Sequence, residues 1–405
     1  MASRGEINKK EIQPILSEKW DVIPFVSSIE NIGTFPKVKT SDCFEEGTYP
    51  VVDQSEKDIT GYINNEELLY KGDLPIIIFG DHTRNIKYVD FPFAAGADGT
   101  KILHTTSILD SKFFYYYLKS LQIPNLGYSR HYSILKQLDV PVPSLNEQKQ
   151  IAEKLDKLFD QIETIKEASN KIPELLKNFR QQVLTYAVTG KLTEEWRKER
   201  QLDEWHTELA KDCCEKVQSG GTPKGGQFAL SGIPFLKVYN IVGNKIDFES
   251  EPQYVSEEIQ NSQIKKSITY PGDVIMNIVG PPLNKVAIIP DTYKEWNINQ
   301  AITLFRPKEY LNNQYLYYFF CEGASVNSVL DKTRGVVGQV NISLSQCREF
   351  AISIPPMEEQ LEIVKRVQTL FDILDDVERR YNTLCEKLDK LPQALLCKAF
   401  KGELI

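Results

Sequence analysis

The fold depends on the stretch VPSLNEQKQIAEKLDKLFDQIE at residues 142–163, because a second copy, IPPMEEQLEIVKRVQTLFDILD, follows at residues 354–375. The offset between the copies stays constant to their far ends, so that Pro143 pairs with Pro355, Gln148 with Gln360 and Gly190 with Gly402. A long duplicated segment predicts a chain built from two related halves.

Apolar residues in both copies recur every three or four positions, which is typical of a helix with one apolar stripe. This coiled-coil seam consists of Ile151, Leu155, Leu158, Ile162, Ile165, Ile172, Leu176, Phe179 and Val183 in the first copy, and of Ile363, Val367, Leu370, Leu374, Val377, Leu384, Leu388, Leu391 and Leu395 in the second. We therefore expect long helices at 143–192 and 355–405. Each has a glutamate in its first turn and a glycine at its end, and Pro173 and Pro392 predict bends near Ile172 and Leu391.

One apolar stripe usually means a surface helix that lies on its own domain. A helix of about 40 residues is roughly 60 Å long, however, which exceeds the size of a domain of this length. We therefore expect the two helices to bury their seams on each other as an antiparallel coiled coil, with pseudo-twofold symmetry and one globular domain near each end.

The segments 1–142 and 213–354 share a plan of short apolar strands followed by an aromatic helical stretch, a glycine-containing loop and a last strand. The strands are expected in YPVVDQ, DLPIIIFG and KYVDFPF of the first segment and in IPFLKVYNI, DVIMNIVG and KVAIIP of the second. The predicted fold class is α+β, with two mixed α/β domains whose sheets are twisted or barrel-like. Residues 193–212 form an acidic linker between the halves.

Composition excludes several classes of protein. A chain of 405 residues with 41% hydrophobic residues has room for two domains. No apolar run is long enough to span a membrane, so a cytoplasmic protein is expected. The seven cysteines form no CxxC pair and the four histidines have no metal-ligand spacing, which predicts reduced thiols and no metal.

The sequence contains no catalytic motif. Gly280-Pro281-Pro282-Leu283 lacks the amide or acid and the aromatic residue of an amino-methyltransferase motif, and the glycine loop at 220–226 lacks the GK[ST] end of a phosphate loop. We therefore expect a non-catalytic chain with no catalytic residues and no cofactor of its own.

Several motifs together resemble the specificity subunit of type I restriction-modification systems. They are the Pro-and-EQ start of each long helix, the helix ends TGKL and KGEL, and the strings FGDHTR, GIPFLKVYNI and PGDVIMNIVG. The resemblance implies that each globular segment is a target recognition domain for one half of a bipartite double-stranded DNA site. It also implies that the helices set the spacing and dock two methylation subunits. No helix of the repeated type precedes Trp20, so no third conserved region is expected there.

The resemblance implies further partners and cofactors. A restriction/translocase subunit would join the complex, and S-adenosylmethionine, ATP and magnesium would serve the partner subunits.

Candidate DNA-contacting residues are loop side chains with the chemistry that bases and phosphates require. They are His82, Thr83, Arg84, Lys101, Arg130 and His131 in the first segment, and Lys224, Tyr239, Asn240, Lys285, Arg334 and Gln339 in the second. His82 is equally explained as a structural histidine between two polar neighbours.

The net charge of −8 favours a different function, because DNA affinity comes largely from Lys and Arg. The acidic excess lies mostly outside residues 213–354, so local basic faces remain compatible with it. The alternative function is a non-catalytic coiled-coil adaptor or scaffold that binds other proteins. A self-contained restriction-methylation enzyme is disfavoured by the missing motifs.

Overall fold

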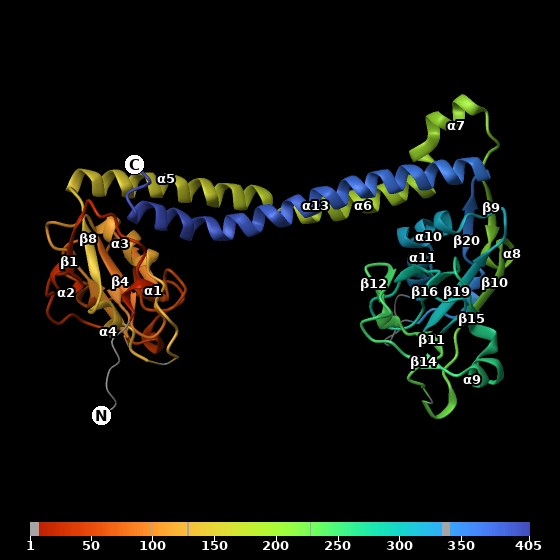
Figure 1. Ribbon diagram of the computed structural model, residues 1–405, viewed down its shortest axis with the longest axis horizontal. Helices are drawn as coiled ribbons and strands as arrows, with labels where there is room; N and C mark the ends of the chain where they lie inside the picture. The colour runs from red at the N-terminus through yellow and green to blue at the C-terminus, as the bar shows by residue number, and fades with distance from the viewer. Residues whose placement is uncertain (1–7, 98, 128, 227, 334–340) are drawn as a thin grey trace. The chain divides into compact units, whose positions relative to one another are not determined.

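The computed structural model describes residues 8–97, 99–127, 129–226, 228–333 and 341–405 (Figure 1). The chain forms two compact units: unit 1 contains Met1–Asn170 and Asn382–Ile405, and unit 2 contains Lys171–Tyr381. Each unit combines a globular body with two pieces of long helix. No helix in the described part of the chain is long and apolar enough to cross a membrane.

Unit 1 has a body of short strands and helices. Its helices are α1 Lys9–Ile12, α2 Phe25–Ser28, α3 Ser111–Ser120, α4 Tyr132–Leu135 and α5 Leu145–Ser169. Its strands are β1 Asp21–Pro24, β2 Tyr49–Val52, β3 Gly61–Ile63, β4 Ile76–Gly80, β5 Ile86–Val89, β6 Ala94–Ala95, β7 Thr100–Leu103 and β8 Asp139–Val142. They form sheets in the orders β1-β8, β3-β2-β6 and β5-β4-β7. The middle strand β4 is an unbroken apolar run because both of its faces are buried.

Unit 2 has more strands and a similar plan. Its helices are α6 Ile172–Val188, α7 Glu194–Arg200, α8 Ala210–Cys213, α9 Glu257–Ser262, α10 Asn313–Glu322, α11 Ala324–Thr333, α12 Leu344–Arg348 and the first part of α13 Met357–Phe400. Its strands are β9 His206–Leu209, β10 Cys214–Ser219, β11 Ile233–Leu236, β12 Ile241–Val242, β13 Lys245–Ile246, β14 Tyr254–Val255, β15 Ile268–Thr269, β16 Val274–Asn277, β17 Val286–Ile288, β18 Trp296–Ile298, β19 Ile302–Pro307 and β20 Ala351–Ile354.

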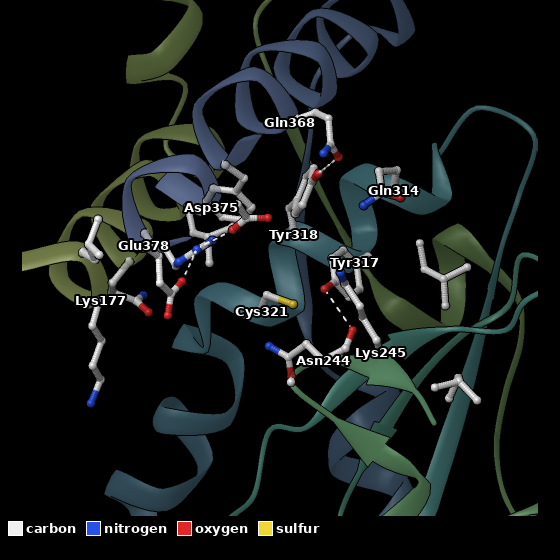
Figure 2. A pocket seen from close by; sticks show the side chains of 18 of the residues that line it. Lys177, Asn244, Lys245, Gln314, Tyr317, Tyr318, Cys321, Gln368, Asp375 and Glu378 are labelled. Carbon is white, nitrogen blue, oxygen red and sulfur yellow. Dashed lines mark hydrogen bonds and ion pairs between the residues drawn. The ribbon is translucent and has the colours of Figure 1, made fainter. Parts of the chain in front are cut away.

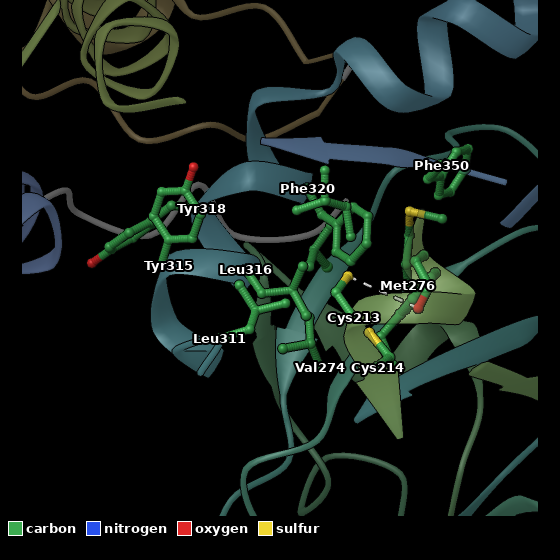
Figure 3. Close-up of a cluster of buried hydrophobic side chains, with 14 of the residues drawn as sticks. Cys213, Cys214, Val274, Met276, Leu311, Tyr315, Leu316, Tyr318, Phe320 and Phe350 are labelled. Atoms are coloured by element: carbon green, nitrogen blue, oxygen red, sulfur yellow. Dashed lines mark hydrogen bonds between the residues drawn. The ribbon is translucent and has the colours of Figure 1, made fainter. Parts of the chain in front are cut away.

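The strands of unit 2 form sheets in the orders β20-β9, β10-β19-β16-β17, β14-β11-β18-β15 and β12-β13. Helix α10 contacts both the sheet strands and α6, so it lies between the sheet and the long helices of its own unit. Side chains from α10, β16 and α8 meet in one buried cluster, where Leu316 and Phe320 lie near Met276 and Cys213 (Figure 3).

These elements confirm the predicted strands and aromatic helices, but the expectation of barrel-like sheets is wrong. The described sheets are small and open, with two to four strands each, and none closes into a barrel. The segment expected to be a linker also has regular structure, since it contains α7 and since β9 pairs with β20.

The first long helix is divided, whereas the second is continuous. Helix α5 ends at Ser169 and α6 begins at Ile172, with Pro173 in its first turn. Proline lacks an N–H and its ring clashes with the preceding turn, so it is tolerated best where a helix starts. The predicted bend near Ile172 is therefore a break between two helices. Pro392, in contrast, lies inside α13, which continues to Phe400.

Within each unit, two pieces of long helix pack antiparallel. In unit 1, Lys154 donates to the carbonyl of Leu404, just beyond the end of α13, at 2.7 Å, and Lys166 lies 3.6 Å from Asp389, so positions rise on α5 as they fall along α13 and the residues just after it. In unit 2, Arg180 of α6 pairs with Asp375 of α13 at 2.5 Å, and Arg366 of α13 donates to the carbonyl of Leu192, just beyond α6, at 2.8 Å.

The predicted seam residues fall into three groups by burial. The buried group is Ile151, Leu155, Ile162, Leu176, Val183, Ile363, Val367, Leu374 and Leu388, and the half-buried group is Leu158, Ile172, Leu370 and Leu395. Five lie exposed: Ile165, Phe179, Val377, Leu384 and Leu391. An α-helix has 3.6 residues per turn, so a strict heptad stripe drifts around its surface. The helix ends instead bury Ala187, Leu396 and Ala399.

The Glu-Gln pair at the start of each long helix fastens the helix to its body. The buried Gln148 donates to the carbonyls of Pro143 and Ile108 and accepts from the Asp110 amide, which begins α3. In unit 2, Gln360 makes the equivalent hydrogen bonds. It donates to the carbonyls of Pro355 and Tyr310 and accepts from the amide of Asn312, the residue just before α10. One side chain thus joins the last strand, the aromatic helix and the long helix of its unit.

The preceding glutamates bind tryptophans. Glu147 accepts from Trp20 Nε1 at 3.0 Å, and Glu359 accepts from Trp205 Nε1 at 2.9 Å. Glu359 is fully buried and also accepts from Thr193 at 2.6 Å and Arg197 at 3.0 Å. Its carboxylate is therefore paired and hydrogen-bonded, as a buried charge requires.

Replacing Gln148 with methionine keeps the side-chain size but removes three hydrogen bonds from buried groups. We predict that Gln148→Met lowers the free energy of unfolding of unit 1 by about 2–4 kcal/mol and leaves unit 2 unchanged, with Gln360→Met doing the reverse. Hydrogen exchange in increasing urea follows each unit separately. The exposed Gln161→Met is the control, expected to change stability by less than about 0.5 kcal/mol. Equal losses in both units for either buried glutamine would contradict the prediction.

Candidate nucleic-acid interface

The turn between β4 and β5 carries three of the predicted DNA-contacting residues, and Gln54 holds this turn in place. The His82 amide donates to Gln54 Oε1 at 3.1 Å and the Thr83 hydroxyl donates to the Gln54 carbonyl at 2.5 Å. Arg84 adopts a left-handed backbone, with φ of 65°, and its guanidinium donates to the Ile123 carbonyl at 3.0 Å. Arg84 therefore connects this turn to the loop that follows α3.

Asp81, the first residue of this turn, contacts two other candidates of unit 1, Lys101 and His131. Its buried carboxylate accepts from the Tyr132 amide at 2.8 Å and lies 3.9 Å from Lys101 Nζ. Its carbonyl accepts from the His131 amide at 2.8 Å, and His131 Nδ1 lies 2.9 Å from the same oxygen. Burial and then the Asp81 charge raise the pKa of Tyr132. We call Asp81, Lys101, His131 and Tyr132 the Asp81 cluster.

The structure thus brings the six predicted residues of unit 1 to one region, but with different exposure. Thr83 and Arg130 are exposed, and the Lys101 side chain is 38% exposed above the Tyr132 ring. His131 is fully buried. Both ring nitrogens of His131 contact the protein and none of the ring reaches the surface.

The four candidates of unit 2 that lie within the described residues are spread over three segments. Lys224 is exposed in the glycine loop, where its amide donates to Gln263 Oε1 at 2.9 Å and the next two residues, Gly225 and Gly226, have positive φ. Tyr239 is partly exposed beside Lys237, whose Nζ lies 5.9 Å from its ring. Burial, and next the Glu251 charge, raise the pKa of Tyr239, so its hydroxyl remains a neutral donor.

The remaining candidates of unit 2 differ in their surroundings. Asn240 is buried and donates to the carbonyls of Asp247 and Glu251, so its predicted base contact is corrected to a role in holding the β12–β13 segment. Lys285 is half-buried, with its backbone amide on Asn277 Oδ1 at 2.7 Å. Arg334 and Gln339 lie outside the described residues.

Sequence reasoning missed the residues that shape these loops. Gln54 and Asp81 were overlooked because the prediction selected side chains that could contact DNA directly, whereas these two hold other residues in place. Lys237 was also overlooked, although its Nζ lies 4.6 Å from the Phe228 ring as well as beside Tyr239. The alternation of lysine with aromatic residues in FLKVYN is the signal that would have found it.

Unit 2 also contains a cavity of about 920 Å³ between its long helices and its body (Figure 2). Tyr318 donates to Gln368 Oε1 at 3.3 Å and Tyr317 donates to the Asn244 carbonyl at 3.0 Å across its wall. Arg180, Asp375 and Glu378 form an ion-paired rim, and the Cys321 thiol lies at the wall. The described residues hold no group of three His, Cys, Asp or Glu side chains placed to bind a metal.

A family model described as "Type I restriction modification DNA specificity domain" matches residues 18–174 and 203–386. The chain therefore belongs to this family. It is 28% identical over 261 residues to the type I restriction enzyme EcoBI specificity subunit of Escherichia coli, covering 61% of this chain and 54% of that protein. The EcoR124I/EcoR124II specificity subunit of Escherichia coli is 26% identical, with 87% and 85% covered.

The chain spans about half the length of the EcoBI subunit and of the similarly matched EcoKI subunit of Escherichia coli strain K12. Among solved structures, the HsdS subunit from Thermoanaerobacter tengcongensis has a TM-score of 0.63 at 16% identity, with 96% of this chain and 98% of that chain covered. A chain from work on complex assembly and conformational transition of the type I R-M system has a TM-score of 0.64 at 16% identity, with 96% and 99% covered. These structural likenesses show the shared fold.

Burial raises the pKa of Cys321 to about 12. At pH 8 a thiol with such a pKa is ionised in roughly one molecule in ten thousand, and the thiolate is the reactive form. We predict that Cys321 reacts with iodoacetamide roughly a thousandfold more slowly in the native chain than in urea, where its pKa returns to about 8.5. Mass spectrometry of peptides at several times measures both rates. Rapid native labelling would contradict a raised thiol pKa, because Cys321 is half-buried at the cavity wall and partly accessible to the reagent.

Proposed function

We propose that this chain is the DNA sequence-recognition subunit of a type I restriction-modification complex, in which each unit reads one half of a bipartite site. The observation that carries the proposal is that each globular body is attached to its long helix by the same hydrogen bonds, made by Gln148 in unit 1 and by Gln360 in unit 2. Two bodies attached in the same way to paired helices suit a protein that reads two short sequences at a fixed separation. The family membership and the names of the relatives agree with it.

The proposal assigns residues 1–142 and 213–354 to the two reading domains, and 143–192 and 355–405 to the helices, joined by the segment 193–212. The helices form an antiparallel coiled coil, and the two halves of the chain form a pseudo-twofold repeat. Support comes from the antiparallel contacts within each unit, where Lys166 pairs with Asp389 and Arg180 pairs with Asp375.

Exposed side chains near the Asp81 cluster supply contacts to the first half-site. Arg130, Thr83 and Lys101 are accessible there, and arginine and lysine are the side chains that best recognise guanine and phosphate. In unit 2 the accessible groups are Lys224, Tyr239 and Lys285. The proposal gives His82 and Arg84 the task of shaping the turn that carries Thr83.

Two methylation subunits dock on the long helices, and a restriction/translocase subunit joins them. Apolar side chains remain exposed on the helices of unit 2, including Leu175, Leu361 and Ile373, each more than half exposed. Such positions favour burial against another protein. S-adenosylmethionine, ATP and magnesium act in those partner subunits, and this chain contributes no catalysis. The adaptor function is not favoured, because the relatives are specificity subunits.

The central test is sequence-selective DNA binding by the complex of this chain with its methylation subunits. We predict that it methylates a single bipartite sequence in the DNA of cells that express it, mapped by methylation-sensitive sequencing. Specific binding should exceed binding to unrelated duplexes by about 10³-fold or more, and both should weaken as salt rises. Binding that ignores sequence would contradict the proposal and favour the adaptor.

Lengthening both helices by one heptad tests whether they set the spacing. Seven residues are inserted after Glu167 and after Lys387, which are one and two residues from the paired Lys166 and Asp389. Because a helix rises about 1.5 Å per residue, the rod lengthens by about 10 Å, or roughly three base pairs. We predict methylation of the same half-sites with a longer spacer. Insertion into one helix alone breaks the pairing and should abolish methylation, while an unchanged spacer would contradict the role of the helices.

A further inference from the structure

The loop between α3 and α4 of unit 1 is fastened to the β4–β5 turn at both of its ends. Near its start, the Arg84 guanidinium donates to the Ile123 carbonyl at 3.0 Å. Near its end, the buried His131 binds the Asp81 carbonyl, and the next residue, Tyr132, donates its amide to the Asp81 carboxylate at 2.8 Å. The end of β4 and the beginning of α4 therefore lie side by side (Figure 1).

The two nitrogens of His131 have defined roles. The Leu126 amide, which can only donate, lies 3.2 Å from Nε2, so Nε2 is the acceptor. The Asp81 carbonyl, which can only accept, lies 2.9 Å from Nδ1, so Nδ1 carries the proton. The neutral ring thus connects the middle of the loop to the end of β4. No other side chain in the described part of the chain has a recorded hydrogen bond to the Leu126 amide.

The surface that this contact supports is exposed and carries basic groups. Leu126 is 54% exposed, and Arg130 is exposed immediately before the buried histidine. Lys101, from β7, lies 3.9 Å from the Asp81 carboxylate and 5.7 Å from the Tyr132 ring centre. Three separate segments, namely the β4–β5 turn, β7 and the loop after α3, therefore meet at Asp81 and share one surface.

We propose that His131 is a positioning residue for recognition of the first half-site: by joining Asp81 to Leu126 it holds the loop that carries Arg130 in register with the β4–β5 turn and Lys101. This inference rests on the proposed function. His131 itself contacts no base, because it is fully buried. Recognition demands a side chain placed to within a fraction of an ångström, which a buried contact provides and a free loop does not.

The inference is tested on the intact complex with its methylation subunits. His131→Ala removes both contacts, whereas His131→Gln retains one donor and one acceptor on its carboxamide. Binding is measured to the methylated sequence and to duplexes with single base changes in either half. We expect His131→Ala to reduce discrimination about tenfold, the worth of one base contact, in one half-site only. Arg130→Ala should reduce discrimination at the same half-site, whereas His131→Gln should retain most of the discrimination of the unaltered complex.

Hydrogen exchange of the free chain separates positioning from general damage. The Leu126 amide should lose protection in His131→Ala and keep it in His131→Gln, while unit 2 stays unchanged in both. Asparagine tolerates the left-handed backbone at position 84, so Arg84→Asn releases the other end of the loop without backbone strain. It should reduce discrimination between bases at the same half-site. His206→Ala removes an exposed histidine of unit 2 that pairs with Glu208 and is the matched control, expected to alter neither half-site.

Two results would overturn the inference: equal loss of discrimination in both half-sites for His131→Ala, or full discrimination despite loss of Leu126 protection. Failure of the proposed function looks different, because the unaltered complex would then show no sequence preference at all. If His131→Ala does not fold, Arg84→Asn and His131→Gln decide the question by the same measurements.

Discussion

The buried glutamine at the start of each long helix is the contact on which the rest of the structure depends. Gln148 and Gln360 each satisfy two carbonyls and one amide, which belong to the segment before the aromatic helix and to the residue after the last strand. A buried amide side chain is stable only when its groups find partners, and the same requirement fixes the direction in which the helix leaves the body. The glutamate beside it adds a tryptophan contact in each unit, and in unit 2 Thr193 and Arg197 complete the pairing of the charge. The Glu-Gln motif therefore attaches each globular body to its long helix.

The exposed loops around Asp81 in unit 1 follow the same physical rule, because buried polar groups hold them in place. Asp81 uses its carboxylate and its carbonyl to hold a turn, a strand and a loop together, and it reaches none of the solvent-facing positions itself. In unit 2, Asn240 holds the β12–β13 segment from a buried position in a similar way. Specificity residues on such loops can change without loss of the fold, because the buried side chains that shape the loops are different residues. Under the proposed function, this division lets an overall acidic chain bind DNA, since only a few exposed cations need to face the duplex.

Much of the fold could be predicted from the sequence, because the repeat and the apolar runs reflect burial directly. The strand from Ile76 to Gly80 and the helix from Ser111 to Ser120 are examples. The division of the first long helix at Ser169 could not be predicted with the same certainty, because Pro173 breaks one helix while Pro392 is accommodated inside another. The residues of the candidate site were harder to predict from the sequence. Composition favours polar loop residues of a certain chemistry, but it does not distinguish Arg130, which is exposed, from its neighbour His131, which tertiary contacts bury.

Unit 1 is assembled from two segments that are far apart in the sequence, and this has a consequence for synthesis on the ribosome. The Ser17 amide donates to the Phe400 carbonyl, and Gly402, with positive φ, approaches Trp20. Unit 2, in contrast, is one continuous segment, Lys171–Tyr381. Domains near the N-terminus generally fold first as the chain emerges. Here unit 2 is complete before unit 1, because all residues of unit 2 are made before residues 382–405. The apolar stripe of α5 therefore stays uncovered until residues 382–405 have left the exit tunnel. The nascent chain therefore carries an incomplete first unit while residues 171–381 are being made.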